Sequence, residues 1–403
     1  MSGVSIDHLI SLVVLLAAIL LFVGLFNQTL SVGIESQRNT TTAKMCSDLI
    51  DAILLNPGLP INGSPIVFGL QDSTLGQYQL SSFSLMRLNS ALGTPISYQK
   101  TGLNYNSMTT FPSNYLIYPY PDMINSSTAS MLLGINGTYG FQLSLTPTVN
   151  ISITEISTNP LSLSLNVIGT SFPLANATVN YILVPVSVNA TYPNFQTISN
   201  QMGTVTTNVL GSAYVTFPNF SLNSNLTYAF VAYAYLDGIA GVGYYEHSTL
   251  GNQRIEPFLN PLSTQNVTLA NSDDIPNTST TVKTLYYNTS FIMESQNYAL
   301  QQALIGSSNS GGSVASGTGM APGSISMGSY TPGILVIAYC NNGNNGIVMM
   351  PWGFSSLGFS MKFGGTPVNQ EWVASDLRQV QINGISYQAR LSLWSLQGYQ
   401  GAG

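Results

Sequence analysis

Acidic side chains near the middle of the chain are the first candidates for chemistry. Asp237, Glu246 and Glu256 lie close together in the sequence, and two carboxyl groups that face one cleft can hydrolyse a glycosidic bond. Asp273 and Asp274 are neighbours, and their oxygens are ligands of the kind that calcium binds. Adjacent acids are more often part of an ordinary turn, and no further motif accompanies the first three. We therefore expect no catalytic residue and no metal site among them.

Other catalytic and metal-binding patterns are missing from the sequence. Histidine occurs only as His8 and His247, too few for a transition-metal cluster. There is no H-E-x-x-H, G-x-S-x-G or P-loop motif, and the glycine-rich run at residues 238–243 lies between two strand-like runs, which favours a hairpin turn. The two cysteines, Cys46 and Cys340, exclude a disulfide-dense scaffold, and a single bridge between them stays open. We expect a protein that is not an enzyme and binds no cofactor.

The composition is poor in charge without being typical of disorder. Charged residues make up 6% of the chain, against about 25% in a typical soluble domain. Hydrophobic residues make up 44%, whereas disordered chains are poor in them, so Ser, Thr, Asn and Gln must supply the polar surface. The nine basic residues leave a gap from Lys100 to Arg254. Because a nucleic-acid surface needs clustered Lys and Arg, we expect no nucleic-acid partner.

An apolar run near the N-terminus predicts a membrane anchor. Residues 9–26 contain no charge and only one polar side chain, Ser11. As a helix they cover about 27 Å, close to the roughly 30 Å hydrocarbon thickness of a bilayer. A cleaved signal peptide is the strongest alternative, but the segment lacks a basic n-region and a small-x-small cleavage site. We expect residues 9–26 to lie in membrane lipid.

The helix is predicted to continue beyond the apolar run. Apolar residues recur at helical spacing between Met45 and Leu54, including Cys46, which we interpret as a small core residue. The run Asn56-Pro57-Gly58 then ends the pattern. We therefore predict one continuous helix over residues 4–56, apolar in its first half and amphipathic in its second.

This helix resembles that of type IV pilins and pseudopilins, including archaeal ones. In that family a long N-terminal helix anchors the subunit in the membrane and later packs in a filament core, while its amphipathic half carries a β-rich head. The resemblance implies processing after Gly3, with Val4 as the new terminus and Asp7 as the acidic residue near the start of the mature helix. Stretches at residues 68–90 and 132–145 also look like a family of archaeal surface proteins.

The basic residues after the apolar run and the composition of the body predict opposite sides of the membrane for the body. Arg38 and Lys44 follow the apolar run, and the positive-inside rule taken alone would put the body in the cytoplasm. The charge-poor, Asn/Ser/Thr-rich composition favours the outside, and we follow it. Thirteen Asn-x-Ser/Thr sequons occur, a modest excess over chance under the acceptor rule. The candidate glycosylation sites are Asn125, Asn136, Asn150, Asn176, Asn189, Asn219, Asn225, Asn266, Asn277 and Asn288.

The body is predicted to be mainly β, with two to three sandwich-like domains after the helix. Short alternating runs between Gly, Pro, Asn and Ser turns are the pattern of a β-sandwich. The run over residues 150–249 resembles bacterial-Ig and transthyretin-like sandwich repeats. Two short helices are expected at residues 78–92 and 288–302, and a flexible Gly/Ser-rich loop at residues 307–333. The expected regions are 1–58 (helix), 59–149 (β-rich head segment), 150–249 (Ig-like sandwich) and 250–403 (C-terminal β domain).

These patterns favour a membrane-anchored, extracytoplasmic structural protein of the cell surface, as a pilin-like filament subunit or pseudopilin. Self-association or other surface subunits are the expected partners. A surface adhesin or carbohydrate-binding protein is the alternative, with tyrosines and Trp352, Trp372 and Trp394 as stacking platforms. Since aromatic residues alternate within strand-like runs, we expect them to lie in the sandwich core. An anchored hydrolase ranks last.

Overall fold

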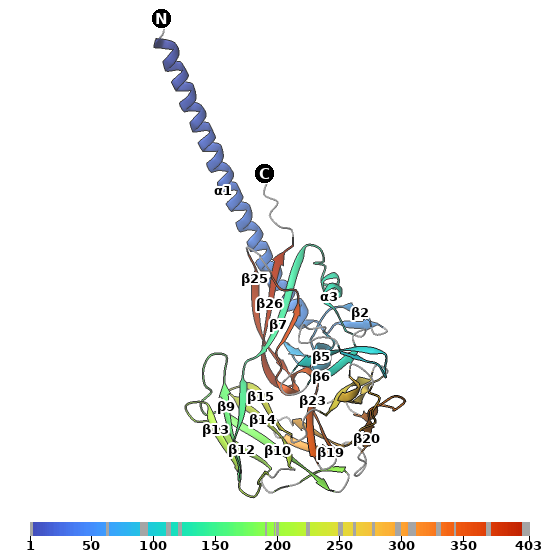
Figure 1. Cartoon of the computed structure of the whole chain (residues 1–403). Helices are drawn as coiled ribbons and strands as arrows, with labels where there is room; N and C mark the ends of the chain where they lie inside the picture. Colours follow the sequence, from blue (N-terminus) through green and yellow to red (C-terminus); the bar gives the residue numbers. More distant parts are fainter. Residues whose placement is uncertain are drawn as a thin grey trace.

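The computed structural model shows a mainly β protein from which one long N-terminal helix projects (Figure 1). This confirms the predicted fold class. The structure describes residues 3–61, 64–88, 96–109, 114–119, 123–189, 192–196, 198, 201–222, 226–248, 253–260, 263–275, 279–294, 300–304, 312–327, 332–341, 344–367 and 372–396.

Helix α1 runs without a break over Gly3–Leu55, which confirms the predicted continuous helix. Threonine is a poor helix former, yet the helix passes through Thr40, Thr41 and Thr42. Each of these hydroxyl groups donates to the carbonyl four residues earlier, at 2.8–2.9 Å, a bond that satisfies the hydroxyl within the helix. The helix ends where Gly58 takes a φ of 68°, a conformation that favours glycine.

The second half of α1 packs on a five-stranded sheet with the order β24-β7-β26-β25-β3 (Figure 1). All pairs are antiparallel except β3 with β25. The strands are β3 (Gln79–Leu80), β7 (Tyr139–Pro147), β24 (Met361–Gly364), β25 (Ala374–Ile382) and β26 (Ile385–Ser395). This sheet joins strands from the two regions 59–149 and 250–403, which are separate in the sequence.

Strands between Asn150 and His247 form two facing sheets, a sandwich as the sequence predicts. One sheet has the order β13-β9-β8, and the other has β11-β10-β14-β15 with β12 beside β10. Their inward side chains enclose a core that includes Leu163, Val215 and Phe230. The strands are β8 (Asn150–Thr158), β9 (Leu161–Ile168), β10 (Thr178–Asn189), β11 (Tyr192–Phe195), β12 (Met202–Thr206), β13 (Ser212–Phe217), β14 (Thr227–Leu236) and β15 (Ile239–His247). The turn from β14 to β15 lies at Asp237 and Gly238, both with positive φ, which confirms a hairpin in the glycine-rich run.

The C-terminal region adds two more sheets. Their orders are β16-β17-β21 and β19-β18-β22-β23, with β20 beside β18. The strands are β16 (Ile255–Asn260), β17 (Ser263–Asn271), β18 (Thr284–Glu294), β19 (Leu300–Leu304), β20 (Gly312–Ala315), β21 (Gly323–Ser326), β22 (Gly333–Asn341) and β23 (Asn344–Trp352).

Two local predictions in this region are wrong. The described residues 288–294 and 300–302 are strand and not helix, because β18 pairs with both β19 and β22 and tertiary pairing overrides helix propensity. The predicted flexible loop at 307–333 contains β20 and β21, and each buries one apolar side chain, Val314 and Ile325. Of the helix expected at 78–92, the described residues 78–88 contain α2 (Ser82–Met86).

Smaller elements complete the described chain. They are β1 (Leu59–Ile61), β2 (Ser64–Val67), β4 (Ile96–Tyr98), β5 (Leu103–Thr109), β6 (Asn114–Pro119), α3 (Ser126–Leu132) and the 3-10 turns η2 (Ser272–Asp274) and η3 (Phe354–Leu357). One apolar core runs from α1 through the sheet beneath it to β22 and β23.

Glycines within strands lie under aromatic rings of neighbouring strands. A Cβ on Gly346 would meet the Tyr339 ring at 2.2 Å, and one on Gly140 would meet Trp394 at 2.4 Å. Both are directly paired residues on adjacent strands. The missing side chain therefore leaves the space that each ring fills, which explains how glycine persists in these strands.

Candidate membrane anchor and assembly helix

The first half of α1 is an apolar surface that no other described part of the chain covers. Large side chains from Leu9 to Phe26 are between about half and two thirds exposed, as with Leu9 at 65% and Phe26 at 56%. By length and composition this helix is able to cross a membrane. Figure 1 shows it projecting well beyond the sheets. Exposed apolar surface of this extent marks a site of contact with lipid or protein.

A polar stalk separates the apolar run from the head. The first fully buried residue of α1 is Thr42, sixteen residues after Phe26, which places about 24 Å of helix between them. Three apolar side chains on this stalk, Leu30, Val32 and Ile34, are exposed by 48–59%. The head thus stands clear of the end of the apolar run.

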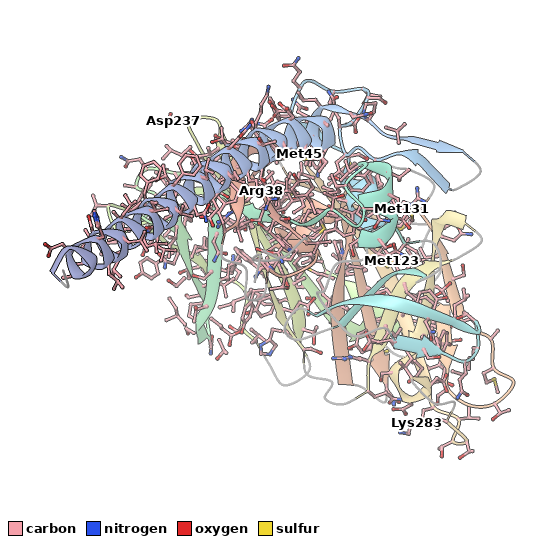
Figure 2. All side chains as sticks on the ribbon, turned by 90° about the horizontal axis from the view of Figure 1, so that it is seen from above. Arg38, Met45, Met123, Met131, Asp237 and Lys283 are labelled. Carbon is pink, nitrogen blue, oxygen red and sulfur yellow. The ribbon has the colours of Figure 1, made fainter. Side chains whose placement is uncertain are left out.

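The second half of α1 is buried on one side against β25 and β26. Cys46, Ile50 and Ile53 are each at most 1% exposed. The Cys46 thiol donates to the Leu391 carbonyl at 3.4 Å, and burial raises its pKa to about 11. Figure 2 shows Met45 where the helix meets the head. Cys46 is therefore a core residue, as predicted. The second half of α1 packs against the sheet through this buried face.

An arginine on β25 holds this half of the helix in place. The Arg378 guanidinium donates to both carboxylate oxygens of Asp51, from Nε at 2.9 Å and from Nη2 at 3.2 Å. It also donates to Ser47 on α1 and to Asp376 on its own strand. Tyr78 adds a hydrogen bond from its hydroxyl to Asp51 at 3.2 Å. A two-pronged guanidinium–carboxylate contact fixes direction as well as distance.

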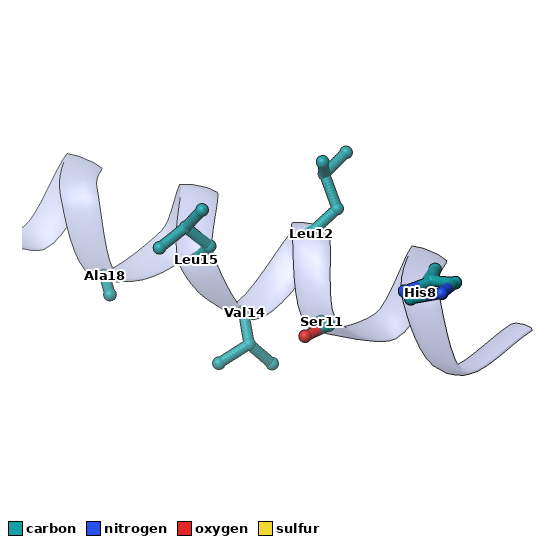
Figure 3. Close-up of a pocket in the computed structure, with 6 residues that line it drawn as sticks. All are labelled: His8, Ser11, Leu12, Val14, Leu15 and Ala18. Atoms are coloured by element: carbon teal, nitrogen blue, oxygen red, sulfur yellow. The ribbon is translucent and has the colours of Figure 1, made fainter.

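The residues predicted for processing and assembly lie at the start of this helix. Gly3 is the first residue of α1, and Asp7 is exposed. The side chain of Val4 lies outside the described part. The shallow hollow nearby is lined by His8, Ser11, Leu12, Val14, Leu15 and Ala18. Figure 3 shows these side chains on a single helix, so they form an open face and not an enclosed cavity.

The three acids considered for hydrolysis do not all gather at one place. Asp237 is exposed at the turn before β15, and Glu246 lies near the far end of that strand, about 30 Å away along an extended chain. Glu246 accepts from the Met349 N–H at 2.8 Å. Glu256 is buried and paired with Arg254, and burial raises its pKa to about 7. Glu246 and Glu256 both act on Tyr339, whose pKa is raised by burial and by these two acids, while Asp237 is remote from Glu246.

The adjacent acids Asp273 and Asp274 bind lysines. Lys283 Nζ lies 2.8 Å from Asp273 Oδ2, and Lys100 Nζ lies 2.7 Å from Asp274 Oδ2. The described residues contain no cluster of three or more potential metal ligands. The two carboxylates thus lie in a 3-10 turn with an ammonium group against each one, which leaves little reason to expect calcium there.

Sequence reasoning missed a polar cluster inside the sandwich. The Tyr228 hydroxyl donates to Glu155 Oε2 at 2.5 Å, and His247 Nδ1 lies 3.2 Å from the same oxygen. The Tyr228 and His247 rings stack with centroids 5.3 Å apart. These residues come from three strands, so no local spacing in the sequence brings them together. The cluster ties the two sheets of the sandwich.

The candidate glycosylation sites differ in exposure. Five are exposed: Asn125, Asn136, Asn150, Asn176 and Asn219. Two are half-buried: Asn266 and Asn288. The side chains of three lie outside the described part: Asn189, Asn225 and Asn277. The Asn288 amide donates to the Pro193 carbonyl at 3.4 Å, which makes it the least accessible of those described.

Aromatic and cysteine side chains serve the core. Trp352 and Trp394 are buried, and Trp372 is exposed by 37%. Two of the three proposed stacking platforms therefore have no free face. Cys46 in α1 and Cys340 in β22 are both buried, and neither forms a disulfide, so the question of a bridge between them is answered in the negative.

Comparisons with known proteins identify no family for this chain. The class of protein is therefore described by the fold alone, as a mainly β head on a long apolar helix. No family model matches the chain, and no curated protein matches it. Solved structures with some similarity include native alpha-2-macroglobulin of E. coli, at 8% identity over 69% of this chain and 19% of that chain, with a TM-score of 0.21. Another is red sea bream transglutaminase, at 10% identity over 51% of this chain and 31% of that chain, with a TM-score of 0.16. This chain spans less than a third of either protein, and neither score indicates a shared overall fold.

Proposed function

We propose that this chain is a membrane-anchored, extracytoplasmic structural protein of the cell surface that assembles through α1 as a pilin-like subunit. The observation that supports this most is the division of α1 into two halves. Residues 7–41 are almost entirely free of contact with the head, whereas the following turns are buried and tied to β25. A helix of this kind transmits force from the membrane to the head as one rigid rod.

The exposed half of α1 needs a partner, and two partners fit its chemistry. Lipid surrounds residues 9–26 in the anchored state, since the run matches the bilayer in length. Helices of other copies replace lipid in an assembled state, with Leu30, Val32 and Ile34 extending the contact into the stalk. Because apolar burial is already present in lipid, close helix–helix packing must drive the exchange.

Asp7 sets a condition on this assembly. A carboxylate among apolar helices is costly unless it is paired. The α-amino group of a neighbouring subunit is a suitable partner, and it is nearest when processing after Gly3 makes Val4 the first residue. The anchor function has no such requirement.

The alternative functions have less support. A carbohydrate-binding adhesin would need exposed aromatic platforms. Trp352 and Trp394 are in the core, so Trp372 and exposed tyrosines such as Tyr214 would have to serve. An anchored hydrolase would need two acids free to face a substrate, but Asp237 and Glu246 lie at opposite ends of β15. Glu246 and Glu256 are bonded instead to the Met349 N–H and to Arg254.

Electron microscopy of the native surface, combined with N-terminal sequencing, tests the proposal. We expect filaments, a mature terminus at Val4, and loss of filaments in Asp7→Ala with the head still folded. Asp237→Asn, an exposed acid in the head, is the matched control and should assemble normally. Normal filaments from Asp7→Ala, or an intact Met1 on assembled subunits, would contradict pilin-like assembly and leave a plain anchor.

A further inference from the structure

The Lys100–Asp274 pair is unusually well enclosed for an ion pair. The Asp274 side chain is 0% exposed and that of Lys100 is 9% exposed. The pair lies beside a small core of aromatic rings, Tyr98, Tyr105 and Phe258. Holding two charges away from water is costly.

The two oxygens of Asp274 are held in different ways. Oδ1 accepts hydrogen bonds from the backbone N–H of Ser279 at 3.2 Å and of Gly317 at 3.0 Å. Oδ2 faces Lys100 and has no other partner among the described residues. Two N–H donors aimed at one oxygen stabilise the negative charge that develops there when a nucleophile attacks the carbonyl carbon.

We propose that Lys100 and Asp274 condense into an intramolecular isopeptide bond. A proton passes from the ammonium group to Oδ2, and the neutral amine attacks Cγ while Oδ1 carries the negative charge. The nitrogen then gives a second proton to Oδ2, which leaves as water. One N–C bond forms, one C–O bond breaks, one water is released, and no oxidant or other reactant is needed.

The surroundings suit the amide product as well as the ion pair. Lys100 Nζ also donates to the Ala315 carbonyl at 3.2 Å. In the product, the single amide N–H keeps that acceptor, and Oδ1 keeps its two donors as the amide carbonyl. The atom that leaves, Oδ2, is the one that no described hydrogen bond holds. Condensation therefore removes two buried charges and loses no hydrogen bond of the protein.

The bond would change the mechanics of the head. It joins the turn after β4 to η2, and the whole sandwich from β8 to β15 lies between the two linked residues. Tension applied through α1 and the strands after η2 would bypass the sandwich. A covalent link across a long loop also restricts the unfolded chain.

Mass spectrometry of the purified, deglycosylated full chain tests the proposal. We expect an intact mass lower by one water than the sequence mass calculated from the N-terminus that sequencing finds, and a branched peptide that joins the segments around Lys100 and Asp274. Lys100→Met should restore the full mass for its sequence. Lys283→Met is the matched control, because the Lys283–Asp273 pair has a similar distance of 2.8 Å but a half-exposed lysine.

The wild-type mass is decisive even when a variant folds poorly. A wild-type chain at its full sequence mass overturns the proposal. So does a missing water that persists in Lys100→Met or that disappears in Lys283→Met, since either result places the linkage elsewhere.

Discussion

Glu256 shows how this charge-poor protein holds an acid in its interior. Its side chain is 6% exposed beside Arg254, and burial raises its pKa to about 7 while the arginine opposes that shift. Between its ordinary value of 4.5 and about 7 the folded chain therefore keeps a proton that the unfolded chain has released. The stabilising contribution is complete below pH 4.5 and is lost as the pH rises through this window.

Glu256→Gln should remove this pH dependence. Between pH 5 and pH 8 we expect the variant to gain about 2–3 kcal/mol in the free energy of unfolding relative to wild type, at 1.36 kcal/mol per pKa unit. Urea unfolding of the detergent-solubilised chain at both pH values measures the difference. Asp237→Asn should run parallel to wild type, and a parallel Glu256→Gln curve would show that burial does not perturb this carboxyl group.

Individual residues also show what sequence reasoning reached and what it missed. Cys46 was predicted to be a core residue from its helical spacing, and its burial confirms this. The partners of Asp274 and Asp51 were not predictable, because Lys100 and Arg378 are remote in sequence and no local pattern links them. Partners of ion pairs that meet only in the folded protein have no characteristic spacing along the sequence, so a sequence pattern cannot predict them.

At the scale of elements, the contact of α1 with its sheet combines apolar burial with one directional clamp. The apolar side chains around Cys46 and Ile50 set which face is buried but allow some sliding along the axis. Arg378 bonds to Asp51 and Ser47, one turn apart on the same helix, and so fixes the position along the axis. Guanidinium geometry is needed for this, since an ammonium group is a point charge without a fork.

Arg378→Lys should loosen the helix without unfolding the head. We expect a loss of about 1 kcal/mol, because both side chains are partly exposed and solvent weakens the pair. Faster hydrogen exchange in the second half of α1 is the more specific readout. Arg390→Lys on β26 is the control, as Arg390 is exposed and touches Ser375; equal exchange in the two variants would rule out the clamp.

Helices and strands were predicted well where a hydrophobic repeat continues over many residues, and poorly where the repeat is short or missing. The apolar and amphipathic runs of α1 extend over many turns, so its continuity could be predicted. The run 288–302 contains good helix formers, but its first part, residues 288–294, lies in β18 between β19 and β22, a place decided by pairing across the sheet. Strands β20 and β21 have four residues each, too short for alternation to be visible among small side chains.

For the whole molecule, the apolar helix was predictable and its attachment to the head was not. The apolar run depends on residues 9–26 alone, whereas the sheet beneath α1 collects strands from Gln79 to Ser395. Contacts between residues so far apart in the sequence depend on the complete fold. The predicted regions 59–149 and 250–403, whose boundaries were drawn from composition, therefore divide the sheet beneath α1. The result is a head in which the chain after α1 returns at its C-terminal end to hold that helix.

The orientation of this head gives the last prediction. The stalk carries Arg38 and Lys44, which by the positive-inside rule favour a cytoplasmic head, while the charge-poor surface with exposed Asn136, Asn150 and Asn176 favours the outside. We expect protease added to intact cells to remove the head, and peptide mass spectrometry to find sugar on these exposed sites but not on Asn288. Asparagine-to-glutamine changes at the exposed sites should each remove one glycan, and the same change at Asn288 should remove none. A protected head without sugar would show that the two basic residues, and not the surface composition, decide the topology.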